Sequence, residues 1–430
     1  MEAAAGIASA GTQNITGGNM SEFAEQIAAA HTVMERSYAA FAAISRANTI
    51  RVLEAMRAEK LAYEHFHAAS GYGYHDAGRD KLEAVTARVF GAEAALMRQQ
   101  IVSGSHAISL ALHGNLLPGD ELVTLGLPYD TLQTIIGMKR PVPGSLAELG
   151  ITHRVLETDF LQPDPRAIAA ALGPRSKMLC IQRSRGYSWR NSLSVAQIAQ
   201  ITRAVKEARP EVIVFVDNCY GEMVEQYEPS HFGADLLAGS LIKNLGAGLT
   251  PCGGYVVGRA HLVERAACKL TVAGAGREVG PSLLENRLYY QALFMAPLIV
   301  AEALAGAVFT ASLLQSRGIT ISPLPEENRT DIIQCAQMPD EAALIAFCQG
   351  IQRYSPVDSF VSPLPWPMPG YDNDIIMASG GFIQGSSIEL SADAPIRPPY
   401  LLFVQGGLSR HHVAYAVEHT LRDMIAKNLI

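Results

Sequence analysis

The sequence predicts an α/β protein with a mostly parallel sheet between helices and a smaller α+β domain after it. Three observations support this class. Short β-rich runs alternate with segments of helical periodicity through the middle of the chain, which is typical of parallel sheets. This alternation stops beyond Gly318, where strand-like runs follow one another more closely. The length of 430 residues also exceeds the roughly 250 to 300 residues at which single cores stop growing.

Composition and charge narrow the class of partner. Hydrophobic residues make up 49% of the chain and charged residues 17%, as in a globular protein with a large buried fraction. The formal net charge of -7 provides no basic field for a phosphate backbone, so we expect small-molecule substrates and no nucleic acid.

Cysteine usage and hydropathy indicate a cytoplasmic protein. The six cysteines are scattered and form no C-x-x-C pair or zinc-site spacing, so we expect buried thiols and no metal site. The first residues lack the basic and apolar blocks of a signal peptide. The longest apolar run, from Ala292, contains Pro297 and Glu302, which favours a buried helix over a membrane span.

An amino-terminal helical extension is expected over residues 1–65. Residues 1–18 are small and polar and read as frayed, and Ser21 with the acidic Glu22 suits a helix start. The helix is expected to run to about Leu61.

The large domain is expected over residues 66–310. Its predicted strands are the runs AALMR, ELVTL, KMLCIQ, VIVFVDN, AGSLIK and GGYVVG. Between two of them, Val195, Ile198, Ile201 and Val205 lie on one face of a predicted helix. The run VIVFV is apolar on both faces, which indicates a central strand covered on both sides.

The small α+β domain is expected over residues 311–430. A long helix from Arg287 leads to the break at Gly318. The predicted elements after it are a strand in TDIIQCAQ, a helix from Glu341, strands in SSIELSAD and YLLFVQGG, and a helix from His411. The proline-rich segment 362–374 cannot form a long regular element, so we expect a loop over a site or a subunit contact.

Polar residues that follow apolar strands are the site candidates, because ligands bind at the carboxyl ends of parallel strands. Asp217 ends the run VIVFV, and Lys243 lies 26 residues later, about one crossover and one strand on. Alone, Asp217 could cap a helix or bind a metal, and Lys243 could extend to solvent. A desolvated amine would instead be nucleophilic towards carbonyls.

A third strand end offers an anion site. Ser103, Gly104 and Ser105 precede a predicted helix, whose free amides can bind phosphate. No P-loop is present, and GAGREVG lacks the spacing of a dinucleotide motif. A phosphate cradle, a strand-end aspartate and a lysine one strand later form the set that holds pyridoxal 5′-phosphate (PLP).

Several motifs in this order resemble the fold-type I PLP enzymes of the cystathionine γ-synthase/methionine γ-lyase group. The chain is most similar to the branch labelled aluminium-resistance or methionine γ-lyase family protein. The motifs are SGYGYHDAGRDKLE, QQIVSGSHAISLAL, PYDTL, GSLIKNLGAGL, GAGREVG and ELSADAPIRPPY. The resemblance implies a PLP-dependent transferase fold with a mostly parallel seven-stranded sheet and a smaller carboxyl-terminal domain.

The resemblance also implies roles for single residues. Lys243 would form the Schiff base and then act as base at the substrate Cα, and Asp217 would pair with the pyridinium nitrogen. The segment Ser103–Ser105 would hold the phosphate, with a hydroxyl added by Ser240. Tyr129 of PYDTL would stack on the ring and assist protonation of the leaving group, or be only a half-buried loop tyrosine.

The motifs say less about which residues contact the substrate and which contact the neighbouring subunit. Arg397 is the candidate clamp for the substrate carboxylate, with Arg185 as its main competitor; Arg183 and Arg190 are further competitors, and a surface ion pair is the alternative for each. Tyr72, Tyr74 and Arg79 stand where the wider family has a segment that reaches the neighbouring subunit's phosphate. Tyr72 is also a candidate for the substrate. A homodimer or homotetramer with sites at the subunit interface is implied, and His106 could face the ring or the solvent.

The predicted function is a PLP-dependent lyase that eliminates a γ- or β-substituent from an L-amino acid. Methionine, cystathionine, O-substituted homoserines and canavanine-like compounds are the candidate substrates, and a 2-oxo acid and ammonia the products. A γ-replacement synthase or an aminotransferase would share Lys243 and Asp217. A non-catalytic PLP-binding regulator is the remaining alternative.

Overall fold

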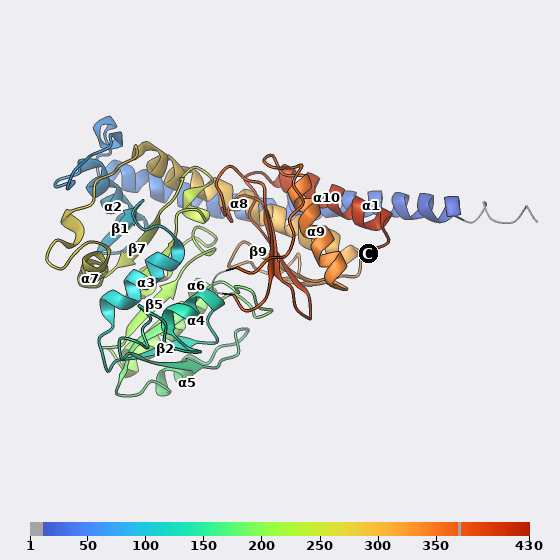
Figure 1. The fold of residues 1–430 in the computed structure, drawn as a ribbon. Helices are drawn as coiled ribbons and strands as arrows, with labels where there is room; N and C mark the ends of the chain where they lie inside the picture. The colour runs from blue at the N-terminus through green and yellow to red at the C-terminus, as the bar shows by residue number, and fades with distance from the viewer. Residues whose placement is uncertain (1–11, 369–370) are drawn as a thin grey trace, which may run out of the picture.

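A seven-stranded sheet lies at the centre of the larger half of the protein (Figure 1). The computed structural model describes residues 12–368 and 371–430. The strand order is β1-β7-β6-β5-β4-β2-β3; β7 is antiparallel to both its neighbours, and the other pairs are parallel. The strands are β1 (Ala94–Arg98), β2 (Glu121–Leu125), β3 (Thr152–Leu156), β4 (Ser176–Gln182), β5 (Ile213–Asp217), β6 (Leu236–Ser240) and β7 (Gly254–Gly258). The predicted mostly parallel sheet is confirmed.

Helices cover both faces of this sheet, because its central strands are apolar on both sides. One face packs on α3 (Gly104–Asn115), α4 (Asp130–Ile136) and α7 (Ala260–Leu270). The other packs on α2 (Ala77–Val89), α5 (Pro165–Ala170), α6 (Val195–Ala208) and α8 (Arg287–Ser316). In α6 the four predicted apolar positions are all buried, and a capping box of Ser194 and Gln197 fixes its start.

A second, antiparallel sheet forms the smaller half. Its order is β10 (Ile375–Ser379), β11 (Ser391–Pro395), β12 (Leu401–Gln405), β9 (Ile333–Gln337) and β8 (Thr320–Ser322). One face packs on α9 (Glu341–Arg353) and α10 (Arg410–Ala426). On the other face, Ile333, Cys335 and Phe403 form a small apolar cluster against the larger half. The second sheet therefore closes over one edge of the first.

Two long helices join the halves. α1 (Thr12–Ala58) lies side by side with α8, and the pair crosses the whole length of the molecule (Figure 1). Both contribute to both cores: Phe23 of α1 is buried with the small sheet and Val52 with the large one. Although α8 is long and apolar enough to span a membrane, 72% of its most apolar window is buried inside the protein.

The amino-terminal expectation needs correction. Helix α1 begins at Thr12 and not near Ser21, because a nucleated helix extends at little cost per residue. Positions 12–18, predicted to be frayed, are thus helical; residues 1–11 lie outside the described part of the chain. The expected domain boundary at residue 310 falls inside α8.

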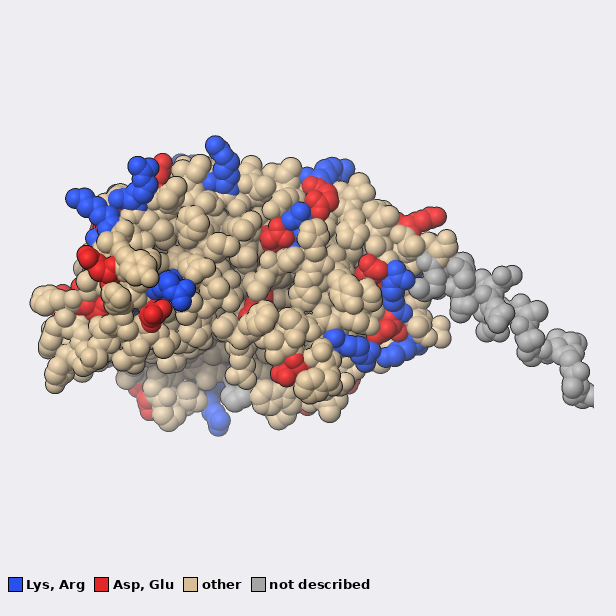
Figure 2. Space-filling model, turned by 90° about the horizontal axis from the view of Figure 1, so that it is seen from above, with Lys and Arg blue, Asp and Glu red and all other residues tan. Residues whose placement is uncertain are grey.

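Other segments differ in detail from the prediction. Strands β3, β8 and β10 were not expected; β3 (THRVL) is partly exposed at the sheet edge and lacks the apolar run of a central strand. Strand β11 starts at Ser391, later than the predicted run from residue 386. The described part of the chain also has four short 3₁₀ turns: Tyr63–Phe66, Pro229–Phe232, Asn244–Gly246 and Gly276–Glu278. On the face in Figure 2, acidic and basic side chains are interspersed over a largely uncharged surface.

Candidate active site

A cavity of about 210 Å³ opens where the parallel strands end at their carboxyl edge. Its floor includes the last residues of three strands: Gln182 of β4, Asp217 of β5 and Ser240 of β6. The facing wall comes from β12 of the second sheet, through Phe403 and Gln405. The site thus lies where the two halves meet.

Lys243 lies on the cavity floor, three residues beyond β6. Its Nζ is 3.9 Å from the centre of the Tyr220 ring, and no carboxylate among the described residues lies within ion-pair distance. Burial favours the neutral amine, but the field of Cys219, Tyr220 and Asp217 outweighs it and raises the pKa of Lys243 well above its usual value. Lys243 is therefore a half-buried lysine that forms no ion pair with a described residue.

Small residues after Lys243 have a steric reason. The chain turns tightly through a 3₁₀ turn that starts at Asn244. A Cβ on Gly246 would lie 1.6 Å from the Leu241 carbonyl oxygen, so no side chain is tolerated there. The glycine therefore fixes the turn that holds the lysine.

Asp217 is 3% exposed at the end of β5. Its Oδ1 accepts a hydrogen bond of 3.2 Å from the Cys219 amide. Burial raises the pKa of Asp217, and the Lys243 ammonium partly offsets this rise. A buried carboxylate in this position can stabilise a protonated nitrogen.

The start of α3 supplies an anion cradle. Ser103 caps the helix by accepting from the His106 amide at 3.1 Å, and Gly104 and Ser105 are its first residues. Free amides point out of the helix here, and the dipole favours a negative group. A Cβ on Gly104 would lie 3.0 Å from the Ser240 Cβ, so glycine keeps the cradle open.

Tyr129 lies beside the cradle and caps α4. Its hydroxyl is 3.5 Å from the Ser105 hydroxyl, and its amide donates to Gln182 at 3.3 Å. Burial, reinforced by Asp217, raises the pKa of Tyr129 well above its usual value. The phenol is therefore a neutral donor.

These side chains fit PLP. A cradle for its phosphate, an aromatic ring, a strand-end carboxylate and an unpaired lysine line one cavity. All seven predicted floor residues are brought together: Ser103, Gly104, Ser105, Tyr129, Asp217, Ser240 and Lys243. In the described ranges, no group of three or more His, Cys, Asp or Glu is arranged to hold a metal ion.

Comparison with known proteins decides the family. A family model described as methionine gamma-lyase matches residues 23–425. The chain belongs to the methionine gamma-lyase family. YnbB of Bacillus subtilis (strain 168) is 50% identical to this chain over 390 residues, which cover 90% of this chain and 93% of YnbB.

Solved structures of related proteins agree with this family. A candidate cystathionine beta-lyase involved in aluminium resistance from Listeria monocytogenes has a TM-score of 0.89 and 45% identity, covering 93% of this chain and 99% of its own. A carbon-sulfur lyase involved in aluminium resistance from Clostridium novyi NT has a TM-score of 0.90 and 42% identity, covering 94% and 96%. The predicted fold-type I class and the predicted branch are confirmed.

The cavity of this methionine gamma-lyase family member also has residues that sequence reasoning missed. They are Thr131, Gln182, Ser184, Gly186, Tyr187, Cys219, Tyr220, Ile242, Ile333, Tyr371, Phe403 and Gln405. Gln182 could have been found, because it ends a predicted strand as Asp217 does. Tyr371 lies in the proline-rich segment, so part of that segment does border the site.

The predicted arginine clamp stays a prediction. Arg397 is exposed and does not line the cavity, because β11 ends at Pro395 and the chain turns before Arg397. Its guanidinium instead partly offsets the rise that burial causes in the pKa of Asp130. No arginine is among the described residues that line the cavity.

In QRSRGYSWRNS, Arg183 and Arg185 are buried and Arg190 is half-buried, and all three contact other parts of the fold. Arg185 donates to the Ser322 carbonyl and hydroxyl at 3.0 and 3.1 Å, and its predicted substrate contact stays a prediction. Arg183 pairs with Glu225 and Glu228. Arg190 donates to the Gln182 carbonyl at 2.9 Å and so supports the floor from behind. None forms the surface ion pair considered as the alternative.

The segment predicted to reach another subunit lies away from the cavity. Arg79 is 3% exposed and donates to the Gly73 and Gly280 carbonyls, so it holds its own loop and contacts no cofactor site of this chain. Tyr72 and Tyr74 are exposed, with ring centres 5.5 Å apart. Their contact with a second subunit stays a prediction.

His106 accepts from the Val102 amide and does not line the cavity.

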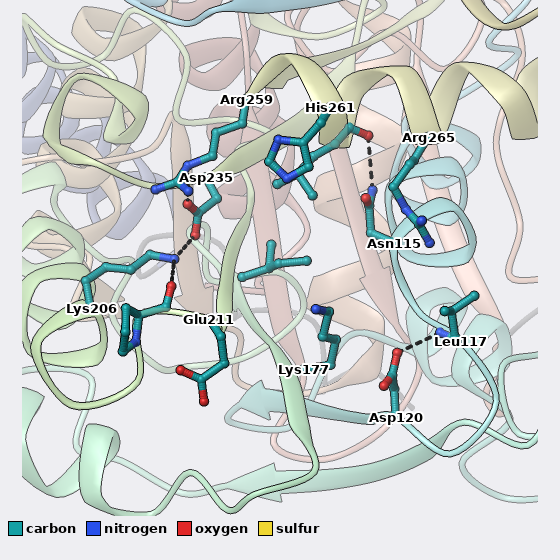
Figure 3. Close-up of a pocket in the computed structure, with 13 residues that line it drawn as sticks. Asn115, Leu117, Asp120, Lys177, Lys206, Glu211, Asp235, Arg259, His261 and Arg265 are labelled. Carbon is teal, nitrogen blue, oxygen red and sulfur yellow. Dashed lines mark hydrogen bonds and ion pairs between the residues drawn. The ribbon is translucent and has the colours of Figure 1, made fainter.

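A second hollow, of about 360 Å³, lies at the opposite edge of the large sheet (Figure 3). Lys177, His261 and Arg265 point into it, while Lys206 and Arg259 bind Asp235. This hollow is larger than the first cavity. Its buried carboxylate, Asp235, forms ion pairs with both Lys206 and Arg259.

Proposed function

We propose that this methionine gamma-lyase family member is a PLP-dependent carbon–sulfur lyase that acts on an L-amino acid. The observation that carries the proposal is the unpaired, half-buried Lys243 beside Asp217, with the α3 cradle in the same cavity. For a γ-thioether, the amino acid and one water give a thiol, ammonia and a 2-oxo acid. With methionine the products are methanethiol, ammonia and 2-oxobutanoate.

The chain's own residues divide the work. The Gly104 and Ser105 amides and the Ser240 hydroxyl hold the cofactor phosphate, and Asp217 holds a proton on the ring nitrogen. When bound, PLP supplies an aldehyde that condenses with the Lys243 amine and a ring that takes up the electron pair left at the substrate Cα. Lys243 Nζ accepts the Cα proton, and the neutral Tyr129 hydroxyl donates a proton to the leaving sulfur. The apolar wall at Phe403 excludes water.

A direct test combines absorbance with product analysis. The purified protein with added PLP is expected to absorb visible light and to release 2-oxo acid and thiol from at least one thioether amino acid. A protein that stays colourless with PLP contradicts the cofactor. Stoichiometric amino transfer to a second oxo acid supports an aminotransferase instead, and thiol exchange without ammonia supports a replacement synthase.

We also propose a cytoplasmic homodimer or homotetramer with sites near the subunit interface. Unpaired cysteines throughout the described chain suit a reducing compartment. The exposed Tyr72, Tyr74 and Leu283 support a subunit contact near the segment whose counterpart in the wider family reaches across. Light scattering coupled to gel filtration tests this, and a monomeric active protein contradicts it.

A further inference from the structure

Tyr220 lines the cavity in a backbone conformation that an aromatic residue rarely adopts. It is the third residue of the turn 218–221, which the Gly221 amide closes by donating to the Asn218 carbonyl at 3.0 Å. Its φ is +70°, in the left-handed region that favours glycine. Such strain persists where the surroundings or the function of a side chain require it. The strained turn places the Tyr220 ring in the cavity, beside Lys243.

The Tyr220 ring is held from both halves of the protein. Its hydroxyl is 3.3 Å from the hydroxyl of Ser387, a buried residue between β10 and β11. The ring packs against the core of the larger half and against the small apolar cluster that includes Phe403. Burial raises the pKa of Tyr220, and Lys243 partly offsets this rise, so the phenol is neutral. The position of the ring is therefore fixed.

The contact of this ring with Lys243 differs in kind from an ion pair. Nζ lies 3.9 Å from the ring centre, well within the roughly 6 Å over which a ring face attracts a cation. Lys206, at the opposite edge of the sheet, is instead bound to the Asp235 carboxylate. A carboxylate can take up a proton from an ammonium, whereas a ring face cannot. The ring thus stabilises the charge of Lys243 and leaves the proton on Nζ.

Other groups near Lys243 do not replace this contact. The titratable groups whose fields reach it are Asp217, Cys219, Glu222, Tyr129, Tyr371 and Asp393. In the described part of the chain, none of the three carboxyl groups forms an ion pair with Nζ. Burial raises the pKa of Glu222 to about 8 and that of Asp393 to about 7, which reduces their negative charge near neutral pH. The Tyr220 ring therefore supplies the direct electrostatic contact of the ammonium.

We infer that Tyr220 is a positioning residue, whose ring holds the charged form of the Lys243 amine in place. This inference rests on the proposed lyase function, in which Nζ accepts the proton from the substrate Cα and becomes an ammonium. The ring stabilises that ammonium and fixes its place in the cavity, and the proton stays available for return to the substrate carbon chain. The unfavourable φ of Tyr220 is what brings the ring under Nζ.

The pKa of the Lys243 amine tests the inference without turnover. Reductive methylation of the PLP-free protein with isotope-labelled formaldehyde marks its lysines for an NMR titration, and Lys243→Ala assigns the signal. In Tyr220→Leu the pKa of this amine should fall by about one pH unit, because the ammonium loses the ring. In Tyr220→Phe, which keeps the ring and loses the Ser387 contact, it should stay as in wild type. The control Tyr227→Leu removes an exposed ring 5.9 Å from the Arg51 guanidinium and should also leave it unchanged.

Turnover provides a second measurement. Tyr220→Leu should lower kcat for 2-oxo acid release about tenfold and leave KM within about threefold, because the substrate still binds but the amine is no longer held. Tyr220→Phe should restore kcat to within about twofold of wild type. If Tyr220→Leu does not fold, Tyr220→Gly, which suits a φ of +70°, gives the same comparison.

The outcomes separate this role from the lyase function. An unchanged pKa of the Lys243 amine in a folded variant without the ring, or an equal fall in Tyr220→Phe, overturns the inference while leaving the lyase intact. Failure of every thioether, including methionine and cystathionine, to yield 2-oxo acid would instead reject the proposed function. The titration of the amine would still show whether the ring holds the ammonium.

Discussion

Two hollows lie at opposite edges of the same sheet, and each has a lysine near a buried aspartate. At the amino-terminal edge, Lys206 and Arg259 both bind Asp235 (Figure 3). Lys206 also donates to the Val212 carbonyl. At the carboxyl edge, Lys243 has the Tyr220 ring at 3.9 Å and no ion pair. The first set of charges is satisfied by the fold, and the second is left for a ligand.

This difference shows what marks the reactive end of the molecule. The hollow with paired charges is larger, about 360 against 210 Å³, so volume does not identify the site. A buried charge without a partner costs stability, and it persists where function requires it. The unpaired state of Lys243, more than its burial, distinguishes it from Lys206.

Replacing each lysine gives the largest contrast. Lys243→Ala should lower kcat by about 10⁴-fold, because the chain loses both its nucleophile and its base. Lys206→Ala should keep activity within about twofold and destabilise the fold by roughly 1–3 kcal/mol, since a buried oxygen of Asp235 loses a donor. Assays of 2-oxo acid release and thermal melts measure both. Comparable activity loss in the two variants would erase the contrast.

Replacing Asp217 and Asp235 should give the same contrast between activity and stability, with a smaller effect on kcat than the lysine variants. Asp217→Asn should retain PLP but lose about 10²–10³-fold in kcat, because a neutral amide cannot hold the ring proton. Absorbance on PLP addition measures retention. Asp235→Asn should lower the melting temperature and leave kcat nearly unchanged. Turnover of Asp217→Asn close to wild type contradicts the role given to Asp217.

Two glycines sharpen the comparison at the level of the backbone. Gly104→Ala should weaken PLP affinity about tenfold, because the new Cβ would lie 3.0 Å from Ser240 in the cradle. In Gly173→Ala, before β4 at the opposite edge, the nearest atom is 4.0 Å away. That variant should bind PLP normally in a fluorescence titration. Equal PLP affinities of the two variants would show that the cradle can accommodate a Cβ at Gly104.

A buried carboxyl behind the active lysine provides the smallest effect on activity. Burial raises the pKa of Glu222 to about 8; its Oε1 accepts from Tyr255 and its Oε2 has no partner. The folded protein binds this proton more tightly than the unfolded chain does. The resulting contribution to stability is fully present below pH 4.5, the ordinary pKa of a glutamate, and is lost as the pH rises through about 8. Glu222→Gln should therefore remove a loss in the free energy of unfolding of roughly 4 kcal/mol between pH 5 and about 9.

Denaturant unfolding at several pH values measures this effect. Activity of Glu222→Gln at pH 7 should stay within about twofold, because Glu222 does not line the cavity. A pH profile of stability identical to that of the wild type would show that Glu222 is already ionised.

The sheet and the cavity floor could be predicted because both depend on local patterns. An apolar run such as VIVFV forms a central strand wherever helices cover it, and its end then falls at the ligand edge. Asp217, Ser240 and Lys243 follow from that rule together with the resemblance. Strand β3 escaped prediction because an edge strand needs no continuous apolar run.

The facing wall could not be predicted in the same way. Phe403 and Gln405 reach the cavity because one face of the second sheet packs over the first, and no local pattern states which face that is. Arg397 lies beyond the end of its strand and is exposed, so its predicted contact with the substrate carboxylate stays a prediction. Where a side chain points depends here on packing between distant segments.

The helices α1 and α8, which both halves share, fix the distance between the floor and the wall of the cavity. Because each helix is buried in both cores, the two halves cannot separate without exposing apolar surface of one of them. One added helical turn in α8, about 5.4 Å, would shift the wall relative to the floor and break the match with α1. The packing register of α1 against α8, far from the reacting atoms, thus sets the distance between the floor and the wall of the cavity, and with it the length of substrate that fits.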